Sequence, residues 1–251
     1  MQVGVITGAS SGIGAALARE LGSRGWLCVL LARREERIRA LAGEIGGEYE
    51  VCDVSDRAAV ESAAARVRER HPQVKLLVNN AGISARADFL AGDPELIEQV
   101  MRTNYLGGLW CLRAFLPALE AASPSDVVNI VSIAGTVAFP PSGPYSASKH
   151  AQLAFSRATS ASLRGRGISV HTVNPGLVET EGFPQRATLK SPFFRRVVIG
   201  PEDVARHVAG LVGKGPRETS VPRWYRLPGI LQALAPNLVA RLIARRSDTY
   251  R

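Results

Sequence analysis

The chain has 251 residues, a formal net charge of +9 and an apolar fraction of 46%. This composition excludes a disordered or collagen-like chain, and the length suits one α/β domain. The longest apolar run, Trp26 to Ala32, is far shorter than the roughly 18 residues of a membrane-spanning helix, so no span is predicted. Basic residues are scattered rather than gathered in a stripe with aromatic residues, so we expect no nucleic-acid partner.

The start of the chain and its cysteines indicate the compartment. An apolar segment, Val3 to Ile6, follows Met1 with no basic region or cleavage site before it, which predicts a cytoplasmic protein. Cys28, Cys52 and Cys111 lie in apolar segments without paired spacing, so we expect them to be reduced and buried. The four histidines lack metal-ligand spacing, and we predict no metal site.

Apolar strand-like runs alternate with amphipathic helical patterns along the chain. We expect strands at Val3 to Ile6, Leu27 to Leu31, Tyr49 to Cys52, Leu76 to Asn79, Val127 to Ser132 and Ile168 to Asn174. We expect helices at Gly14 to Arg24, Glu35 to Glu44, Ala58 to Arg70, Pro94 to Leu119 and Ser146 to Leu163. Repeated strand, helix, strand units require right-handed crossovers, so the predicted fold is α/β, a doubly wound parallel sheet with helices on both faces.

The last third of the chain departs from this pattern. Gly182, Pro184 and Pro192 predict an irregular loop at about residues 178–200, over the sheet edge where open α/β proteins bind ligands. We expect residues 1–220 to form the main domain and residues 221–251 to form a helical tail.

A glycine-rich turn, Thr7 to Gly14, lies between the first strand and the first helix. There the amides of a helix start can face the pyrophosphate of a dinucleotide, and glycine allows a tight turn and a close approach. We expect cofactor contacts from Gly8, Ser10, Ser11, Gly12, Ile13 and Gly14.

The second strand ends on Ala32, Arg33 and Arg34. NAD-binding proteins of this architecture place an acidic residue here against the ribose hydroxyls, whereas a guanidinium binds the additional ribose phosphate of NADP. The sequence therefore favours NADP(H) over NAD(H), with Arg33 as the first candidate contact. Arg34 is the second candidate, and a solvated helix start describes it equally well.

Further motifs follow in an order that resembles the short-chain dehydrogenase/reductase family, over about residues 3–215. They are Asp53-Val54, Asn79-Asn80-Ala81-Gly82, Asn104, Ser132, Tyr145-Ser146-Ala147-Ser148-Lys149, Pro175-Gly176 and Thr180. The resemblance implies a single-domain Rossmann fold, commonly a homodimer or homotetramer, with the catalytic residues Asn104, Ser132, Tyr145 and Lys149. It also implies cofactor contacts from Asp53, Val54, Asn80, Ala81, Gly82, Tyr145, Lys149, Pro175, Gly176, Val178 and Thr180.

The spacing of Tyr145 and Lys149 has a chemical reason of its own. Residues four apart share a helix face, so the ammonium of Lys149 can lie close to the Tyr145 phenol. A nearby positive charge lowers the pKa of a tyrosine from about 10 towards neutral pH, which makes it an effective general acid or base. We expect Ser132 and Tyr145 to bind a substrate carbonyl and Tyr145 to supply the proton. By resemblance, Asn104 holds a water that links Lys149 to solvent.

The expected activity is the NADP-dependent interconversion of a carbonyl and an alcohol. Apolar walls of the cleft are indicated by Phe139, Pro140, Phe183, Phe193 and Phe194. They favour a hydrophobic substrate, whether lipid-like, ketoacyl, steroid-like or xenobiotic. Core packing explains these phenylalanines equally well. The alternatives are a non-catalytic NADP-sensing regulatory protein, an NAD-dependent alcohol dehydrogenase and a sugar-nucleotide epimerase. The intact catalytic residues disfavour the first, and the short C-terminal region disfavours the last.

The tail carries an apolar helix face. Its members are Leu238, Val239, Leu242 and Ile243, flanked by Arg241, Arg245 and Arg246. Such a face needs a partner. Packing on the same or a neighbouring subunit is one solution, and docking on an anionic membrane is the other.

Overall fold

Seven parallel strands form one sheet in the computed structural model, which describes residues 1–84, 88–184 and 197–247. The strand order is β3-β2-β1-β4-β5-β6-β7, and every neighbouring pair is parallel. The chain starts in the middle at β1, builds outward to β3, then crosses to β4 and continues to β7. The predicted doubly wound parallel sheet is confirmed, and its winding reverses between β1 and β4.

The elements alternate along the described chain. The strands are β1 (Val3–Thr7), β2 (Leu27–Ala32), β3 (Glu48–Val51), β4 (Leu76–Asn79), β5 (Ser125–Ile130), β6 (Ile168–Pro175) and β7 (Glu218–Val221). The helices are α1 (Gly12–Ser23), α2 (Glu35–Ile45), α3 (Arg57–Arg70), α4 (Pro94–Met101), α5 (Gly107–Ala121), α6 (Gly143–Leu163), α9 (Pro201–Ala209), α10 (Arg226–Leu234) and α11 (Pro236–Ser247). The short turns include a π-helical turn, η1 (Arg102–Leu106), and the 3₁₀ turns η2 (Ile133–Gly135) and η5 (Arg223–Tyr225).

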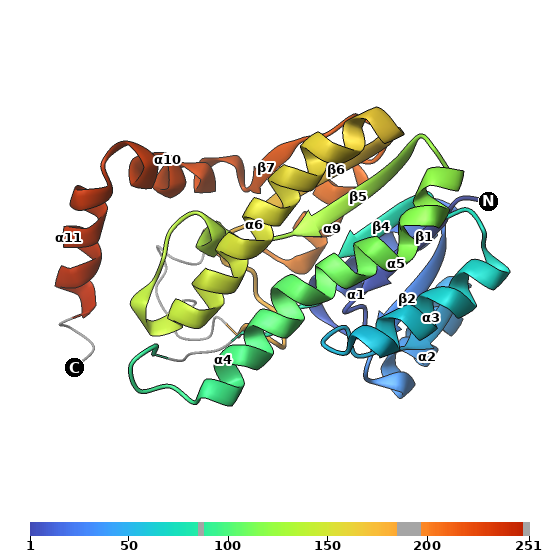
Figure 1. The fold of residues 1–251 in the computed structure, drawn as a ribbon, viewed down its shortest axis with the longest axis horizontal. Helices are drawn as coiled ribbons and strands as arrows, with labels where there is room; N and C mark the ends of the chain where they lie inside the picture. The colour runs from blue at the N-terminus through green and yellow to red at the C-terminus, as the bar shows by residue number, and fades with distance from the viewer. Residues whose placement is uncertain (85–87, 185–196, 248–251) are drawn as a thin grey trace.

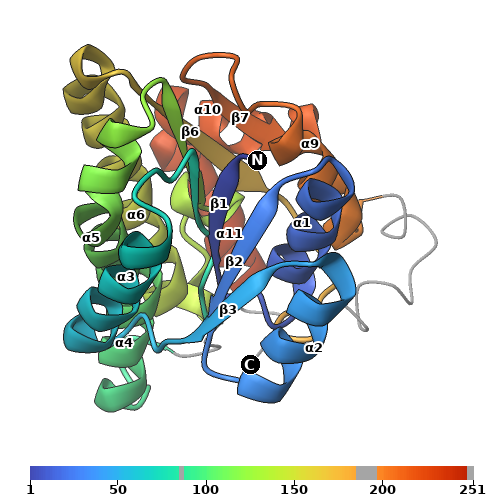
Figure 2. The same cartoon turned by 90° about the vertical axis from the view of Figure 1, so that its right-hand side faces the viewer.

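Helices cover both faces of the sheet (Figures 1 and 2). On one face α1, α2 and α9 enclose a core that includes Ile6 and Leu30. On the other face α3 and α5, with part of α6, enclose a core that includes Val5, Val29 and Leu31. Successive strand residues point to opposite faces, so neighbours such as Val5 and Ile6 belong to different cores. Burial on both faces is why the central strands are continuously apolar.

The helix expected at Pro94 to Leu119 is interrupted. α4 ends at Met101, the π-helical turn η1 follows, and α5 begins at Gly107. The turn η1 contains no proline or glycine, so no helix-breaking residue within it reveals the interruption. A Cβ added to Gly107 would lie 2.9 Å from Cγ2 of Val54, which shows how closely this turn approaches the loop after β3. The turn buries Asn104, and such π-turns recur at functional sites.

Three further elements differ from the expectation. β5 ends at Ile130, and Ser132 caps the turn η2 instead of ending the strand. The edge strand β7 was not predicted, because its four residues are mostly polar and show no apolar run. The helix α9 was also missed, although Val204 and Val208 have helical spacing and are buried against α1.

The tail contains the two helical stretches expected on either side of Pro236, namely α10 and α11. In Figure 1 they extend from β7 to the end of the molecule that the carboxyl ends of the strands face. Among the described residues no single helix has the length and apolar content to cross a membrane. The stretches Arg223–Leu234 and Pro236–Ala244 pass that test only as a pair, which is bent by 109°.

Candidate active site

A cleft of about 760 Å³ opens at the carboxyl edge of the sheet. It crosses the point between β1 and β4 where the winding reverses, which is where open α/β sheets bind ligands. The predicted site residues that line it are Gly8, Ser10, Ser11, Gly12, Ile13, Arg33, Arg34, Asp53, Val54, Asn80, Ala81, Gly82, Ser132, Tyr145, Lys149, Pro175, Gly176, Val178 and Thr180. The remaining two, Gly14 and Asn104, lie behind this lining.

The glycine turn is held close to the segment after β4. Gly8 and Gly12 have φ values of +66° and +56°, which residues with a side chain rarely adopt. A Cβ added to Gly8 would lie 2.7 Å from Cα of Ala81, and one added to Gly14 would lie 2.5 Å from the carbonyl oxygen of Gly8. These positions therefore require glycine, as the predicted dinucleotide turn does.

Thr7 connects this turn to the segment Asn80-Ala81. Its hydroxyl accepts the backbone N–H groups of Asn80 and Ala81, each at 3.0 Å, and donates to the carbonyl of Val78 at 3.2 Å. The Asn80 amide in turn donates to the carbonyl of Thr7 at 2.9 Å. These bonds fix the ends of β1 and β4 relative to each other, and no sequence motif had singled out Thr7 for this task.

The two arginines after β2 have different surroundings. Arg33 lies 3.6 Å from the Asp53 carboxylate, and its side chain is 58% exposed. Arg34 reaches back over the glycine turn, where its Nη2 donates to Ser10 Oγ at 2.9 Å and to Ser11 Oγ at 2.7 Å. Both guanidinium groups line the cleft, so the structure keeps both as candidates for binding a phosphate.

Glu181 provides a carboxylate to the same arginine cluster. Its Oε1 pairs with Nη1 of Arg34 at 2.9 Å, and its Oε2 accepts from Nη1 of Arg37 at 2.5 Å. Hydrogen bonds from Arg37 and Arg34 lower the pKa of Glu181, so this carboxylate is charged at neutral pH. The loop after β6 is thereby connected to the region after β2. Neither Arg37 nor Glu181 was predicted from the sequence.

Tyr145 and Ser132 meet on the other side of the cleft. Ser132 lies at the start of η2, where its Oγ accepts the N–H of Ala134 at 3.1 Å. Tyr145 lies in the first turn of α6 and shares a hydrogen bond with Ser132, which lowers the tyrosine pKa. Burial has the larger and opposite effect and raises the pKa of Tyr145 to about 12. The phenol is therefore protonated at neutral pH.

Lys149 lies one helical turn after Tyr145 and is almost fully buried. Its Nζ donates to the carbonyl of Ile130 at 3.0 Å and to Oε1 of Gln152 at 2.7 Å, and it lies 5.8 Å from the centre of the Tyr145 ring. Burial lowers the pKa of Lys149 to about 7. The expected lowering of the tyrosine pKa by the lysine is not found in this structure, where burial has the largest effect on Tyr145 and Ser132 is the group that lowers its pKa.

Asn104 is fixed by the π-turn and by its own hydrogen bonds. Its Oδ1 accepts the N–H of Ile83 at 2.8 Å, and its Nδ2 donates to the Ile83 carbonyl at 3.0 Å and to Ser148 Oγ at 2.9 Å. A Cβ added to Gly82 would lie 3.2 Å from Asn104 Oδ1 and 3.8 Å from Lys149 Nζ. The asparagine and the lysine thus approach one point on the cleft wall.

A sequence model described as short chain dehydrogenase matches residues 2–189. The chain belongs to this family. Dehydrogenase/reductase SDR family member 7B of Bos taurus is 31% identical, in a match covering 98% of this chain and 82% of the relative. Farnesol dehydrogenase of Aedes aegypti is 33% identical, over 86% of this chain and 91% of the relative. The predicted family and fold class are confirmed, and the chain is an oxidoreductase of the short-chain dehydrogenase family.

Solved structures of the family resemble this one closely. A variant of actinorhodin polyketide ketoreductase with NADPH superposes with a TM-score of 0.80 at 32% identity, covering 88% of this chain and 95% of the other. Other similar structures were determined with NADP or 5-hydroxy-NADP. A nicotinamide cofactor also fits the residues present here, because the glycine turn leaves its backbone uncovered at the start of α1 and the arginine cluster adjoins it.

The outer wall of the cleft is apolar. Phe139 and Phe183 line it and are partly exposed, and the Phe183 ring lies 5.1 Å from the ring of Tyr145. Phe193 and Phe194, which were expected to join them, lie outside the described residues. Among the residues that the structure describes, no group of three histidine, cysteine or acidic side chains is arranged to hold a metal ion.

Proposed function

We propose that this short-chain dehydrogenase reduces a hydrophobic ketone or aldehyde to the alcohol with NADPH, and catalyses the reverse oxidation with NADP. The observation that carries the proposal is one cleft in which a protonated Tyr145, bonded to Ser132 and one turn before Lys149, faces a glycine turn bordered by Arg34. The apolar side chains of Phe139 and Phe183 support a hydrophobic substrate.

Binding of NADP would divide between two groups of residues. The first-turn amides of α1 and the hydroxyls of Ser10 and Ser11 suit the pyrophosphate, because they present N–H and O–H donors to an anion. The guanidinium groups of Arg33 and Arg34 suit the ribose phosphate, to which they can form forked hydrogen bonds. Asp53 and Val54, at the end of β3, line the cleft where adenine would lie.

When bound in this cleft, a nicotinamide would supply or accept the hydride. Ser132 and Tyr145 donate hydrogen bonds to the substrate oxygen, which polarises the carbonyl and orients its carbon. Tyr145 Oη then gives its proton to the oxygen as negative charge develops there. A pKa of about 12 keeps this proton in place at neutral pH until the reaction creates a stronger base.

Lys149 restores the proton to Tyr145. Its ammonium lies on the same helix face, and its pKa of about 7 allows it to lose and regain a proton near neutral pH. Asn104 keeps the wall beside the lysine in place through its bonds to Ile83 and Ser148. We assign to Asn104 the holding of a water that connects Lys149 with solvent.

Cofactor choice is tested by fluorescence titration with NADPH and NADH, using the wild type, Arg33→Ala and Arg34→Ala. We expect tighter binding of NADPH, and a loss of at least about tenfold in NADPH affinity alone in one or both variants, since a charged phosphate contact is worth about 1.5 kcal/mol or more. Equal affinity for the two cofactors in the wild type would refute NADP preference.

Catalysis is tested with Tyr145→Phe in a panel of long-chain aldehydes, ketoacyl thioesters and steroid ketones. Because general acid catalysis contributes roughly 100-fold or more, kcat should fall by at least that factor while the NADPH dissociation constant stays the same. Turnover that survives in Tyr145→Phe would remove this residue from the mechanism. Reduction of sugars but of no apolar carbonyl would refute the substrate class.

We further propose a cytoplasmic homodimer or homotetramer. All three cysteines are free and buried, which suits a reducing compartment. The long helices α5 and α6 lie side by side on one face of the sheet and provide a surface for a second copy (Figure 1). Light scattering on the purified protein would measure the number of subunits, and a monomer at micromolar concentration would refute this part of the proposal.

A further inference from the structure

Exposed large apolar side chains are concentrated in two regions of the described surface. The first, which we call the tail surface, lies on η5, α10 and α11 and consists of Trp224, Leu227, Ile230, Leu231, Leu234, Leu238 and Leu242. The second, which we call the cleft mouth, consists of Phe139 and Phe183, which line the cleft, together with Phe89, whose ring lies against Gly143 at the start of α6, and its neighbour Leu90. Outside these two regions only Met1 and Val51 are described as large, apolar and exposed. Such an accumulation marks a contact site for an apolar partner.

The tail surface is anchored beside the cleft. The ring of Tyr225 packs on Gly176, which lines the cleft, and its hydroxyl donates to the carbonyl of Val197 at 3.0 Å. At α10, Gly229 lies against Thr136, which directly follows the turn η2 that Ser132 caps. Figure 1 shows α10 and α11 extending from β7 at the carboxyl end of the sheet. The residues that line the cleft follow the same ends of the strands.

The protein itself covers only a small part of the tail. Tyr225 and Val239 are buried, but Leu234 is 80% exposed and Leu227 is 57% exposed. Of the apolar face expected on α11, Val239 alone is buried, and Leu238 and Leu242 remain open. Packing on the same subunit therefore does not account for this surface.

The charges of the tail indicate that its partner is negatively charged. From Thr219 to Ser247 the sequence contains five arginines and no acidic residue. Of these, Arg223, Arg226 and Arg241 are exposed and belong to the same helices as the leucines. A second copy of the tail would bring like charges together, which opposes pairing. A surface that is apolar and negatively charged satisfies both features.

We propose that the tail surface docks on an anionic phospholipid membrane. The leucines and Trp224 enter the boundary between headgroups and acyl chains, and the arginines pair with the lipid phosphates. The helices lie in the membrane plane, since α10 has nine residues and the two helices are bent by 109°. In this position the cleft mouth opens towards the lipid. An apolar carbonyl dissolved in the membrane then enters the cleft directly, a step that rests on the function proposed above.

The docking is tested by flotation of the full-length protein with vesicles of phosphatidylglycerol and phosphatidylcholine, and with vesicles of phosphatidylcholine alone. We expect binding to the anionic vesicles and none to the neutral ones. The double change Leu227→Ser and Leu234→Ser should weaken binding by about 30-fold or more, because two side chains lose their burial in lipid. Arg241→Gln should weaken it by about fivefold, since each arginine near such a surface contributes about 1 kcal/mol.

A matched control is Val51→Thr, which alters an exposed apolar side chain on β3, far from the tail. It should leave vesicle binding unchanged. NADPH affinity and the unfolding temperature should be equal in the wild type and the serine pair, which shows that the variant is folded. Wild-type protein that does not float with anionic vesicles would overturn the proposal. So would a serine pair that turns a dimer into a monomer while vesicle binding is unchanged.

The two proposals fail separately. If the protein binds anionic vesicles but reduces no carbonyl, docking stands and the proposed function is wrong. If it reduces soluble carbonyls but does not bind vesicles, the function stands and docking is wrong. If both hold, reduction of a long-chain aldehyde embedded in anionic vesicles should be several-fold faster for the wild type than for the serine pair, with equal rates on a short, water-soluble aldehyde.

Discussion

The ammonium group of Lys149 has a hydrogen-bond partner, Gln152, that no family motif includes. Gln152 lies three positions later on α6, is buried, and accepts a hydrogen bond from Lys149 Nζ at 2.7 Å. A buried ammonium loses hydration, and the amide oxygen of Gln152 replaces part of it. Burial still lowers the pKa of Lys149 to about 7. The position of the alkaline limb of the activity profile should therefore depend on Gln152.

Replacing Gln152 by Leu removes this acceptor and should lower the pKa of Lys149 further. If the protonated lysine is the active form, the fall in kcat/KM on the alkaline side should move to lower pH by about one unit, since a hydrogen bond to a charged group contributes about 1.5 kcal/mol. Gln152→Glu should move it to higher pH, because a carboxylate favours the ammonium. Gln99→Leu, an exposed glutamine on α4, should have no effect. Equal pH profiles in all variants would contradict the role of Gln152.

Glu181 is expected to weaken the binding of NADPH. Its carboxylate, charged at neutral pH, pairs with Arg37 and also occupies a donor of Arg34 that a ribose phosphate would need. Glu181→Gln should therefore tighten NADPH binding several-fold, because Arg34 loses a charged competitor for the phosphate. NADH, which lacks the phosphate, should bind with unchanged affinity. Titration of both cofactors measures this, and an equal change for NADH would mean that Glu181 acts on the fold of the loop instead.

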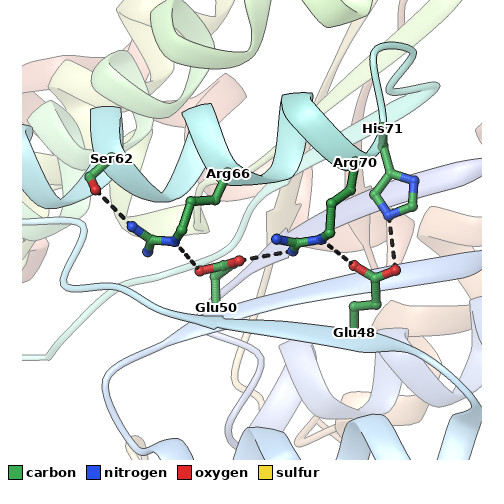
Figure 3. Close-up of polar contacts among 6 residues, drawn as sticks. All are labelled: Glu48, Glu50, Ser62, Arg66, Arg70 and His71. Atoms are coloured by element: carbon green, nitrogen blue, oxygen red, sulfur yellow. Dashed lines mark hydrogen bonds and ion pairs between the residues drawn. The ribbon is translucent and has the colours of Figure 1, made fainter.

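At the scale of elements, the edge strand β3 is attached to α3 by a network of charges (Figure 3). Arg70 donates to Glu48 at 3.0 Å and to Glu50 at 2.8 Å, and His71 contacts Glu48 at 3.0 Å. Arg66 also donates to Glu50, at 2.8 Å. The Glu50 side chain is only 10% exposed, so its charge needs these partners. Since β3 has a strand neighbour on one side only, this network gives it a second attachment, to α3.

Arg70→Met keeps the aliphatic part of the side chain and removes the charge between the two carboxylates. The free energy of unfolding should fall by about 1–2 kcal/mol, because Glu50 is desolvated while Arg70 is partly exposed. Urea denaturation at pH 7 measures the loss. Arg57→Met breaks a largely exposed pair with Glu61 and should cost less than about 0.5 kcal/mol. Similar losses in the two variants would show that burial of Glu50 has no influence.

The pH dependence of this network has a defined sign. Burial alone would raise the pKa of Glu48, but hydrogen bonds from His71 and Arg70 outweigh it and lower that pKa below the ordinary value of 4.5. A lowered folded-state pKa stabilises the protein above pH 4.5, and this stabilisation is lost as the pH falls through the folded-state value. The difference between the wild type and Arg70→Met should therefore shrink below pH 4.5.

At the scale of the whole molecule, elements with a repeating apolar pattern and local motifs can be predicted from the sequence. Contacts between segments that are distant in the chain cannot. Strands buried on both faces are continuously apolar, so the central strands β1, β2 and β4 were placed to within about a residue. The edge strand β7 and the π-turn η1 leave no such pattern. The glycine turn and the spacing of Tyr145 and Lys149 are local motifs and were found. Glu181 reaches Arg34 across 147 residues, and only the folded chain could bring the two together.

The glycine turn offers a last test, because the end of β1, the start of α1 and the segment after β4 come together there. Gly14 lies where α1 approaches both the turn and Asn80, and a Cβ on it would lie 2.5 Å from the carbonyl oxygen of Gly8 and 2.6 Å from the Asn80 amide. Gly14→Ala should therefore lower the free energy of unfolding by about 1–3 kcal/mol. Gly43→Ala is the matched control, since Gly43 also lies in a helix but has no atom within 4 Å of the added Cβ. It should raise stability by up to about 1 kcal/mol.

Ligand-linked stability separates a local role of this turn from a global one. NADPH at about 100 times its dissociation constant should add about 2.7 kcal/mol to the unfolding free energy of the wild type and of Gly43→Ala. In Gly14→Ala the displaced turn should remove most of this gain, so that the two glycine variants differ more with NADPH than without it. Calorimetry with and without NADPH measures both quantities. An undiminished gain in Gly14→Ala would mean that the cofactor does not bind at the glycine turn, which would contradict the site proposed above.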